Sequence, residues 1–381
     1  MLTMLLTFST LLAVLIGGSL LSQLGMIPAE PWLHFVLAAG IFPLSTTAII
    51  FFAAVLSRRQ LATGQLKLLP GIMLVAGCLV SAVSVHLISD RYAILAVVLI
   101  LAVLWHLDRW IRKKLDPLGH HPTLDWYRAS LLCLACGLVA ASLVPFLPEW
   151  AAALRTLHTR ISLYGFLGLS AVGTLQFLMS AVENRPDPSL GRRLRSGLPW
   201  ALFGVSMLAF GDFLKPWGHA LGAAFLSWPL LQVVWIWCRR YRRDVFALHG
   251  VAPMLCATLL GYIASLGGML VSPRLPIGMV DIFLPGFVFP LISGAAGYLI
   301  PAWKEAKHRP TTAYINNHRL NHWSGIRAVM FLLSAIAPFF GFQESGLFGV
   351  AGLAWFEAEL VMWTLSSDGP THKMKQVDIA R

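Results

Sequence analysis

The chain has 381 residues, of which 57% are hydrophobic and only 12% are charged. A soluble domain usually carries about 25% charged residues, and the mean hydropathy of +0.72 points in the same direction. These values exclude a soluble globular protein, because such a protein needs a wetted surface and a bilayer removes that need. The net charge of +12 lies in short loops between apolar runs. That distribution favours membrane orientation, and not nucleic acid, as the reason for the basic residues.

Apolar runs of about the length of a membrane span recur along the whole chain. A span needs about 20 mostly apolar residues, and twelve runs approach this length: 2–22, 32–56, 66–88, 91–107, 127–147, 157–181, 196–213, 218–238, 249–272, 279–302, 323–341 and 346–365. The first run has no basic segment and no clear small-residue cleavage site, so we interpret it as a span and not as a signal peptide. The predicted fold is one all-α integral membrane domain, 1–381, with about 12 transmembrane helices.

The charges of alternate loops predict the orientation of these spans. One set of loops is basic and includes 108–126, 182–195 and 303–321. The other set is short and nearly neutral: 23–31, 148–156, 214–217, 273–278 and 342–345. Loops rich in Lys and Arg face the cytoplasm. We therefore expect a multi-pass protein of a bacterial inner membrane, in contact with the lipid bilayer, with both termini in the cytoplasm.

Three even-numbered spans resemble one another in sequence. The second reads HFVLAAGIFPLSTTAIIFF from His34, and the sixth reads HTRISLYGFLGLSAVGTLQFL from His158. The tenth reads DIFLPGFVFPLISGAAGYLIP from Asp281. All three are predicted to run from the outside inward, and each begins with a polar residue near the periplasmic side.

The spacing of the glycines in these spans indicates a repeat. Aligning Gly40 with Gly165 needs a shift of 125 residues, and aligning Gly165 with Gly286 needs a shift of 121. Each shift covers four helices, which predicts three four-helix pseudo-repeats: about 1–110, 111–240 and 241–381. Small residues also allow close helix packing without any repeat. Either way, four glycines should face neighbouring helices: Gly165, Gly173, Gly286 and Gly294.

Several residues on the predicted periplasmic side could bind a prosthetic group. His34 and His158 open the second and sixth spans, His86 ends the third, and Arg160 follows His158 by two residues. Neutral imidazole is a common ligand of metals and heme, and arginine can pair with heme propionates. The alternative is that these side chains only contact lipid headgroups. His34 and His158 are the first candidates because they occupy nearly corresponding positions, and His86 is the reserve.

The last two spans contain three further ionisable residues, Arg327, Glu357 and Glu359. A proton path needs such groups, but two acids near a helix end are also ordinary.

The chain resembles the large subunit of heme-copper oxidases and nitric oxide reductases, in particular the short bacterial members of that superfamily. LHTRISLYGFLGLSAVGTL follows the pattern of the family's sixth span, and FLPGFVFPLISGAAGYLIPAW is similar to its tenth. The resemblance covers most of the chain in architecture and about 70 residues in motif. It implies an electron-transport protein whose cofactor is a b-type heme in preference to copper. It also implies membrane or periplasmic redox proteins as partners.

The sequence departs from this family at its ligands. The resemblance implies that histidines of the second and tenth spans hold a heme; His34 matches the first, but the run 279–302 has no histidine. His158 matches the family's copper ligand of the sixth span, whereas the seventh span, 196–213, lacks the expected pair of histidines. A complete oxygen- or nitric-oxide-reducing centre therefore cannot be assembled, and whether the chain is an enzyme stays open.

These departures limit the function that the resemblance implies. We expect at most one heme or metal near the periplasmic face, with an electron-transfer, sensory or accessory role. One alternative is a transporter or a cofactor-handling protein, since internal repeats suit transporters. Another is a non-catalytic structural subunit of a respiratory or metal-enzyme complex.

Overall fold

The computed structural model describes residues 2–26, 29–57, 66, 68–89, 91–113, 120–214, 216–271, 282–305 and 320–367. These residues form helices joined by turns, with no strand among them. Eight helices in this part of the chain are long and apolar enough to cross a membrane: Pro31–Leu56, Arg91–Arg112, Thr123–Leu143, Pro148–Val182, Trp217–Arg240, Ala252–Leu270, Leu284–Pro301 and Gly346–Leu365. The all-helical, multi-pass membrane class predicted from composition is confirmed.

The principal α-helices, in chain order, are α1 (Leu2–Gln23), α2 (Ala29–His34), α3 (Phe42–Leu56), α4 (Leu69–Ser84), α5 (Arg91–Arg112), α6 (Thr123–Leu143), α7 (Ala151–Arg160), α8 (Leu169–Val182), α9 (Leu190–Ala209), α10 (Pro216–Arg240), α11 (Arg242–Val245), α12 (Ala252–Val271), α14 (Phe289–Glu305), α16 (Ser324–Ile336) and α17 (Gly346–Ser367). Three shorter apolar helical stretches accompany the eight long ones: Leu12–Ser22, Leu69–Ser84 and Ser324–Phe340.

Local sequence explains several helix boundaries. Proline stands in the first turn of α4, where its missing N–H removes no intrahelical hydrogen bond. The turns after α1 and before α12 contain Gly25 and Gly250, whose φ angles of 70° and 95° are left-handed. Only glycine adopts this backbone region without steric cost, so these residues allow the chain to reverse sharply.

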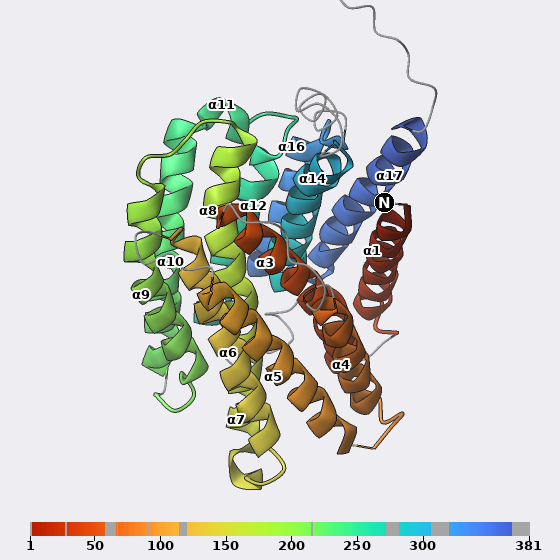
Figure 1. Ribbon diagram of the computed structural model, residues 1–381, viewed down its shortest axis with the longest axis vertical. Helices are drawn as coiled ribbons and strands as arrows, with labels where there is room; N and C mark the ends of the chain where they lie inside the picture. Colours follow the sequence, from red (N-terminus) through yellow and green to blue (C-terminus); the bar gives the residue numbers. More distant parts are fainter. Residues whose placement is uncertain are drawn as a thin grey trace, which may run out of the picture.

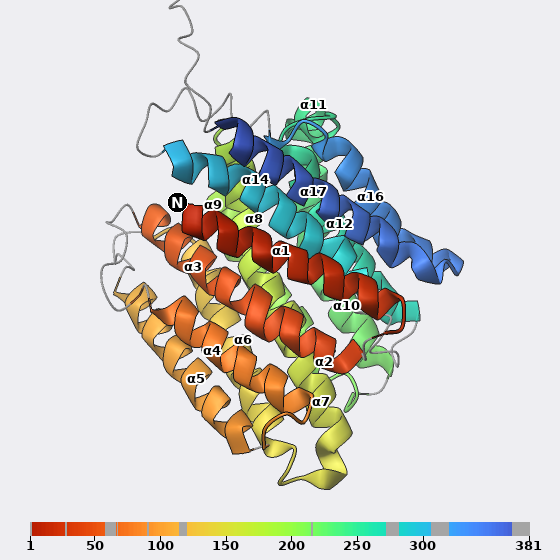
Figure 2. The ribbon, with the colours of Figure 1, turned by 90° about the vertical axis from the view of Figure 1, so that its right-hand side faces the viewer.

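The helices pack side by side in one bundle (Figure 1). The last helix, α17, packs against both α16 and α1, so the two terminal helices of the described chain are neighbours, as Figure 2 also shows. Figure 1 shows α7 at the bottom of the bundle and α11 at the top. We call the end that holds His34 and His158 the histidine end, and the end that holds α11 the arginine end.

A π-helical segment occurs in each of the three helices that resemble one another in sequence. η1 (Phe35–Ile41) joins α2 to α3, η4 (Ile161–Gly168) joins α7 to α8, and η5 (Leu284–Val288) precedes α14. Such segments are rare, and they are frequent at functional sites. η1 begins directly after His34, and η4 begins three residues after His158.

A glycine of a neighbouring helix packs closely against each π segment. A Cβ atom on Gly77 of α4 would overlap the η1 backbone, and one on Gly261 of α12 would overlap the η5 backbone. A Cβ on Gly137 of α6 would lie 2.7 Å from the side chain of Ile161 at the start of η4. The absence of a side chain therefore sets how near each neighbouring helix comes, as in many membrane bundles.

The predicted packing of four glycines is confirmed, because all four are buried and a Cβ atom would meet a side chain of another helix. The distances from such a Cβ to the facing Cβ are 2.7 Å for Gly165 and Cys133, 2.8 Å for Gly173 and Trp126, 2.6 Å for Gly286 and Ala335, and 3.0 Å for Gly294 and Met254.

Two predicted boundaries at the histidine end are wrong. Most of the predicted loop 148–156 is helical, because η3 (Pro148–Trp150) leads directly into α7. The run of three alanines at the start of α7 favours a helix, although it lacks the length of a span. His86 does not end the third span, since α4 ends at Ser84 and His86 lies in the following turn with φ of 57°.

Candidate histidine site

The structure places His34 and His158 at the same end of the bundle, within electrostatic range of each other. His34 is the last residue of α2, and His158 lies in the last turn of α7. Both side chains are half-buried, and the two imidazoles lie close enough to interact electrostatically. Figure 2 shows α2 and α7 both toward the lower end of the bundle. The two helices are about 120 residues apart in the chain, so their placement at one end is a property of the fold.

A backbone carbonyl fixes the orientation of His158. Nδ1 of His158 lies 2.9 Å from the carbonyl oxygen of Gly137 in α6. A carbonyl only accepts, so Nδ1 carries the proton and donates it. The other ring nitrogen, Nε2, has no hydrogen bond to any residue that the structure describes. This is the arrangement that second-shell groups impose on metal-ligating histidines.

Arg160 is held in a polar cluster beside this pair. Its side chain is 5% exposed, and its Nη1 donates to the carbonyl oxygen of Leu208 (3.2 Å), to Oδ1 of Asp212 (3.3 Å) and to Nδ1 of His219 (3.2 Å). Because arginine cannot accept, Nδ1 of His219 is the acceptor, and its Nε2–H donates to Asp212 over 3.0 Å. The cluster thus joins the start of η4 to the turn between α9 and α10.

The π segment η4, which begins three residues after His158, packs against aromatic side chains. Tyr262 of α12 stacks on Tyr164 of η4, with ring centroids 5.8 Å apart, and its hydroxyl donates to the Tyr164 carbonyl over 3.1 Å. A Cβ on Gly168 would overlap the Tyr262 side chain. The hydroxyl thereby satisfies a carbonyl of the π segment, whose backbone bonding departs from the α-helical pattern.

His86, the reserve ligand, lies apart from this arrangement. Its side chain is exposed in the turn after α4, and among the residues described no hydrogen bond joins it to His34 or His158. Within that same set, no three His, Cys, Asp or Glu side chains gather closely enough to hold a metal ion. Protein ligands for zinc or copper usually number three or four, whereas two imidazoles suffice for the axial ligands of a heme.

The ion pair of the last two spans is more than an acidic helix end. Arg327 of α16 is fully buried and donates from Nη1 to Oε2 of Glu359, which is 7% exposed. The guanidinium also lies 5.1 Å from the centre of the Phe356 ring. The reading of two ordinary acids near a helix end is wrong for Glu359, because α17 continues to Ser367. The pairing of α16 with α17 supplies the partner.

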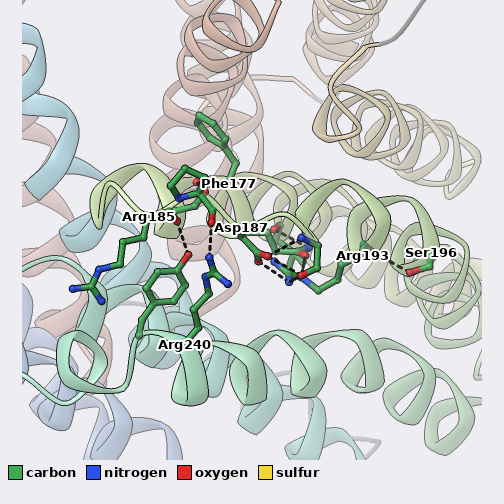
Figure 3. Close-up of polar contacts among 12 residues, drawn as sticks. Phe177, Arg185, Asp187, Arg193, Ser196 and Arg240 are labelled. Carbon is green, nitrogen blue, oxygen red and sulfur yellow. Dashed lines mark hydrogen bonds and ion pairs between the residues drawn. The ribbon is translucent and has the colours of Figure 1, made fainter.

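The arginine end carries a second polar cluster, shown in Figure 3. Asp187 accepts from Nη1 of Arg193 at 2.9 Å, and both side chains are less than 10% exposed. Burial opposes ionisation of Asp187, but hydrogen bonds from Ser189 and from Arg193 hold its pKa below the usual value. Nearby, the pKa of Glu183 is raised to about 7, first by burial and then by the charge of Asp244.

Further contacts fasten the same loop to the end of α10. Arg240 donates to the Pro186 carbonyl, and the Tyr241 hydroxyl donates to the Arg185 carbonyl over 3.0 Å. Arg185 in turn pairs with Asp244 at 3.0 Å. The loop between α8 and α9 is therefore held in place by Arg185 from the loop itself and by Arg240 from the end of α10.

Comparisons of the chain with protein-family models, with curated proteins and with solved structures find no significant match. The function proposed below consequently rests on the geometry of the chain itself, together with the motif resemblance.

Proposed function

We propose that the chain is a multi-pass membrane protein, similar in architecture to heme-copper oxidases, that binds one b-type heme between His34 and His158. The observation that carries the proposal is the placement of these two histidines at one end of the bundle, within electrostatic range of each other, with Gly137 orienting His158. Both come from helices of similar sequence, and each stands just before a π segment. The role is electron transfer, sensing or an accessory function in a bacterial inner membrane.

The wider architecture belongs to the same proposal. Twelve spans in three four-helix units would combine the eight long helices with the shorter apolar helices and α9. The three π segments support the repeat, because a shift of 125 carries η1 onto the start of η4 and a shift of 121 carries η5 back onto η4. The basic loops at the arginine end would then face the cytoplasm and the histidine end the periplasm.

The residues at the histidine end fit a heme better than a bare metal ion. His34 and His158 would hold the heme and Arg160 would lie beside it as a positive charge; when bound, the heme would supply reversible one-electron exchange. The Gly137 carbonyl keeps His158 in the tautomer that presents Nε2. Arg160 is already bonded to Asp212, so a heme propionate would share this guanidinium with Asp212.

Heme content tests the proposal directly. The full-length chain, purified in detergent from heme-replete cells, should show a Soret band and about one heme per chain. His34→Ala and His158→Ala should each lose most of the heme, whereas His86→Ala, an exposed histidine near the same end, should keep it. A heme-free wild type would refute the proposal, and loss confined to His86→Ala would move the ligand there.

One observation favours transport as a second candidate. Ionisable groups buried within membrane spans are rare and mark ion or proton pathways, and Arg327 and Glu359 form such a buried pair. Proteoliposomes with a trapped pH dye, given a potassium diffusion potential, would report proton entry. A flux abolished by Glu359→Gln supports transport, and an equal flux in protein-free liposomes excludes it.

A further inference from the structure

A groove opens at the arginine end where α10 gives way to α11. Its volume is about 630 Å³, and the described residues that line it are Arg242, Arg243 and Phe246. Both arginine side chains are exposed, and the Phe246 ring is 71% exposed. The groove thus combines two adjacent positive charges with an uncovered aromatic ring.

The arginines around the groove differ in how their charges are compensated. Arg239 lies over the ring of Trp235, 4.6 Å from its centre. Arg240 donates a hydrogen bond to the Pro186 carbonyl in the loop between α8 and α9. Asp244, the acid that follows Arg243 in the chain, pairs with Arg185. Within the described chain, no ion pair or hydrogen bond engages the side chain of Arg242 or Arg243.

These two guanidinium groups suit a phosphate. The planar fork of arginine donates two parallel hydrogen bonds to a phosphate group, and it is less strongly hydrated than the ammonium of lysine. Two such forks on consecutive residues, neither in an ion pair within the described chain, form an attractive site for an anionic headgroup. Basic pockets on the cytoplasmic side of membrane proteins bind such headgroups.

The apolar surface beside the groove indicates that the anion carries acyl chains. Trp235, four residues before Arg239 in α10, and Leu248, two residues after Phe246, are 60% and 59% exposed. Tryptophan at this position is typical of the interface between bilayer and water. A soluble phosphate would leave these side chains uncovered, whereas a phospholipid would place its chains against Trp235 and its headgroup at Arg242 and Arg243.

We infer that this groove, lined by Arg242, Arg243 and Phe246, is a binding site for an anionic phospholipid. Its affinity depends on the two uncompensated guanidinium groups, and its preference for lipid over free phosphate depends on Phe246 and Trp235. The site lies at the opposite end of the bundle from the histidine pair, so it is independent of heme binding.

Native mass spectrometry of the full-length chain, titrated with phosphatidylglycerol or phosphatidylcholine in detergent, tests the inference. The variant Arg242→Gln/Arg243→Gln should bind phosphatidylglycerol about 30-fold more weakly, since each arginine near a membrane surface contributes about fivefold. The control Arg192→Gln/Arg195→Gln removes the same charge from exposed positions elsewhere at this end and should change binding less than threefold.

Two results of these titrations would overturn the inference of a specific lipid site. Equal losses in both double variants would overturn the inference, because they would indicate diffuse attraction to the whole basic face. Tight binding of phosphatidylcholine by the wild type would also overturn it. Phe246→Ala, with both arginines intact, should weaken the binding of phosphatidylglycerol and leave the binding of inorganic phosphate unchanged. If free phosphate displaces the lipid at equal concentration, the site binds phosphate and not lipid.

Discussion

Replacing Gly77 by alanine should push α4 away from the π segment that follows His34. A Cβ atom on Gly77 would lie 2.7 Å from Cα of Ala39 and would overlap the Ala38 carbonyl, whereas ordinary contacts begin at 3.4 Å. The obstacle is backbone and cannot rotate away, so one helix has to shift. Overpacking of this kind costs roughly 1–3 kcal/mol, which exceeds the gain of at most about 1 kcal/mol that alanine brings to a helix.

Gly71 provides a matched control in the same helix. It is exposed, and a Cβ there would meet nothing within 4 Å, so Gly71→Ala should leave stability unchanged or raise it slightly. The two variants can be compared by thermal or denaturant unfolding of the purified protein in one detergent, followed by tryptophan fluorescence. Equal midpoints for the two variants would refute the reasoning that the close approach at Gly77 limits the packing of α4 on η1.

Three further predictions concern the two ends of the bundle. Asp187→Asn should lower the free energy of unfolding by about 3 kcal/mol, because it leaves Arg193 buried without its counter-charge. In the wild type the stabilisation by this ion pair is present at neutral pH. It is lost as the pH falls below 3.8, through the lowered pKa of Asp187. Glu183 has the opposite sign: its pKa of about 7 makes stability fall as the pH rises from 4.5 to 7, and in unfolding curves measured across this range Glu183→Gln should flatten that slope, while an unchanged slope would assign it to another group. A cysteine in place of Glu183 should react with a membrane-impermeant maleimide only in inverted vesicles and one in place of Glu149 only in intact spheroplasts; the reverse pattern would invert the topology.

Much of the fold follows from features that sequence carries locally. Apolar runs of span length become helices because a helix satisfies its backbone hydrogen bonds within the segment itself, which lipid requires. The facing of Gly165 and Gly286 toward other helices follows from their small size alone. The helical character of 148–156 was missed because the run of alanines in α7 is neither apolar enough nor long enough to register as part of a span.

The arrangement of the site depends on tertiary contacts that composition does not encode. Sequence placed His34 and His158 on the same side of the membrane, but their proximity depends on how α2 and α7 pack. The bonding of Arg160 to Asp212 required the turn between α9 and α10 to come back beside η4. A basic residue three positions into the apolar helix α16 was a signal that Arg327 needs a buried partner.

The π segment η1 carries a consequence for how this chain tolerates insertion and deletion. A π segment accommodates one residue more than an α-helix does over the same turn. Loss of a single codon within η1 would therefore leave a continuous helix, with little change to α3. The end that carries His34 would, however, rotate by about 100°, the angle per residue of an α-helix, and would turn the imidazole away from His158. A frame-preserving deletion of one residue could separate the two histidines without altering either.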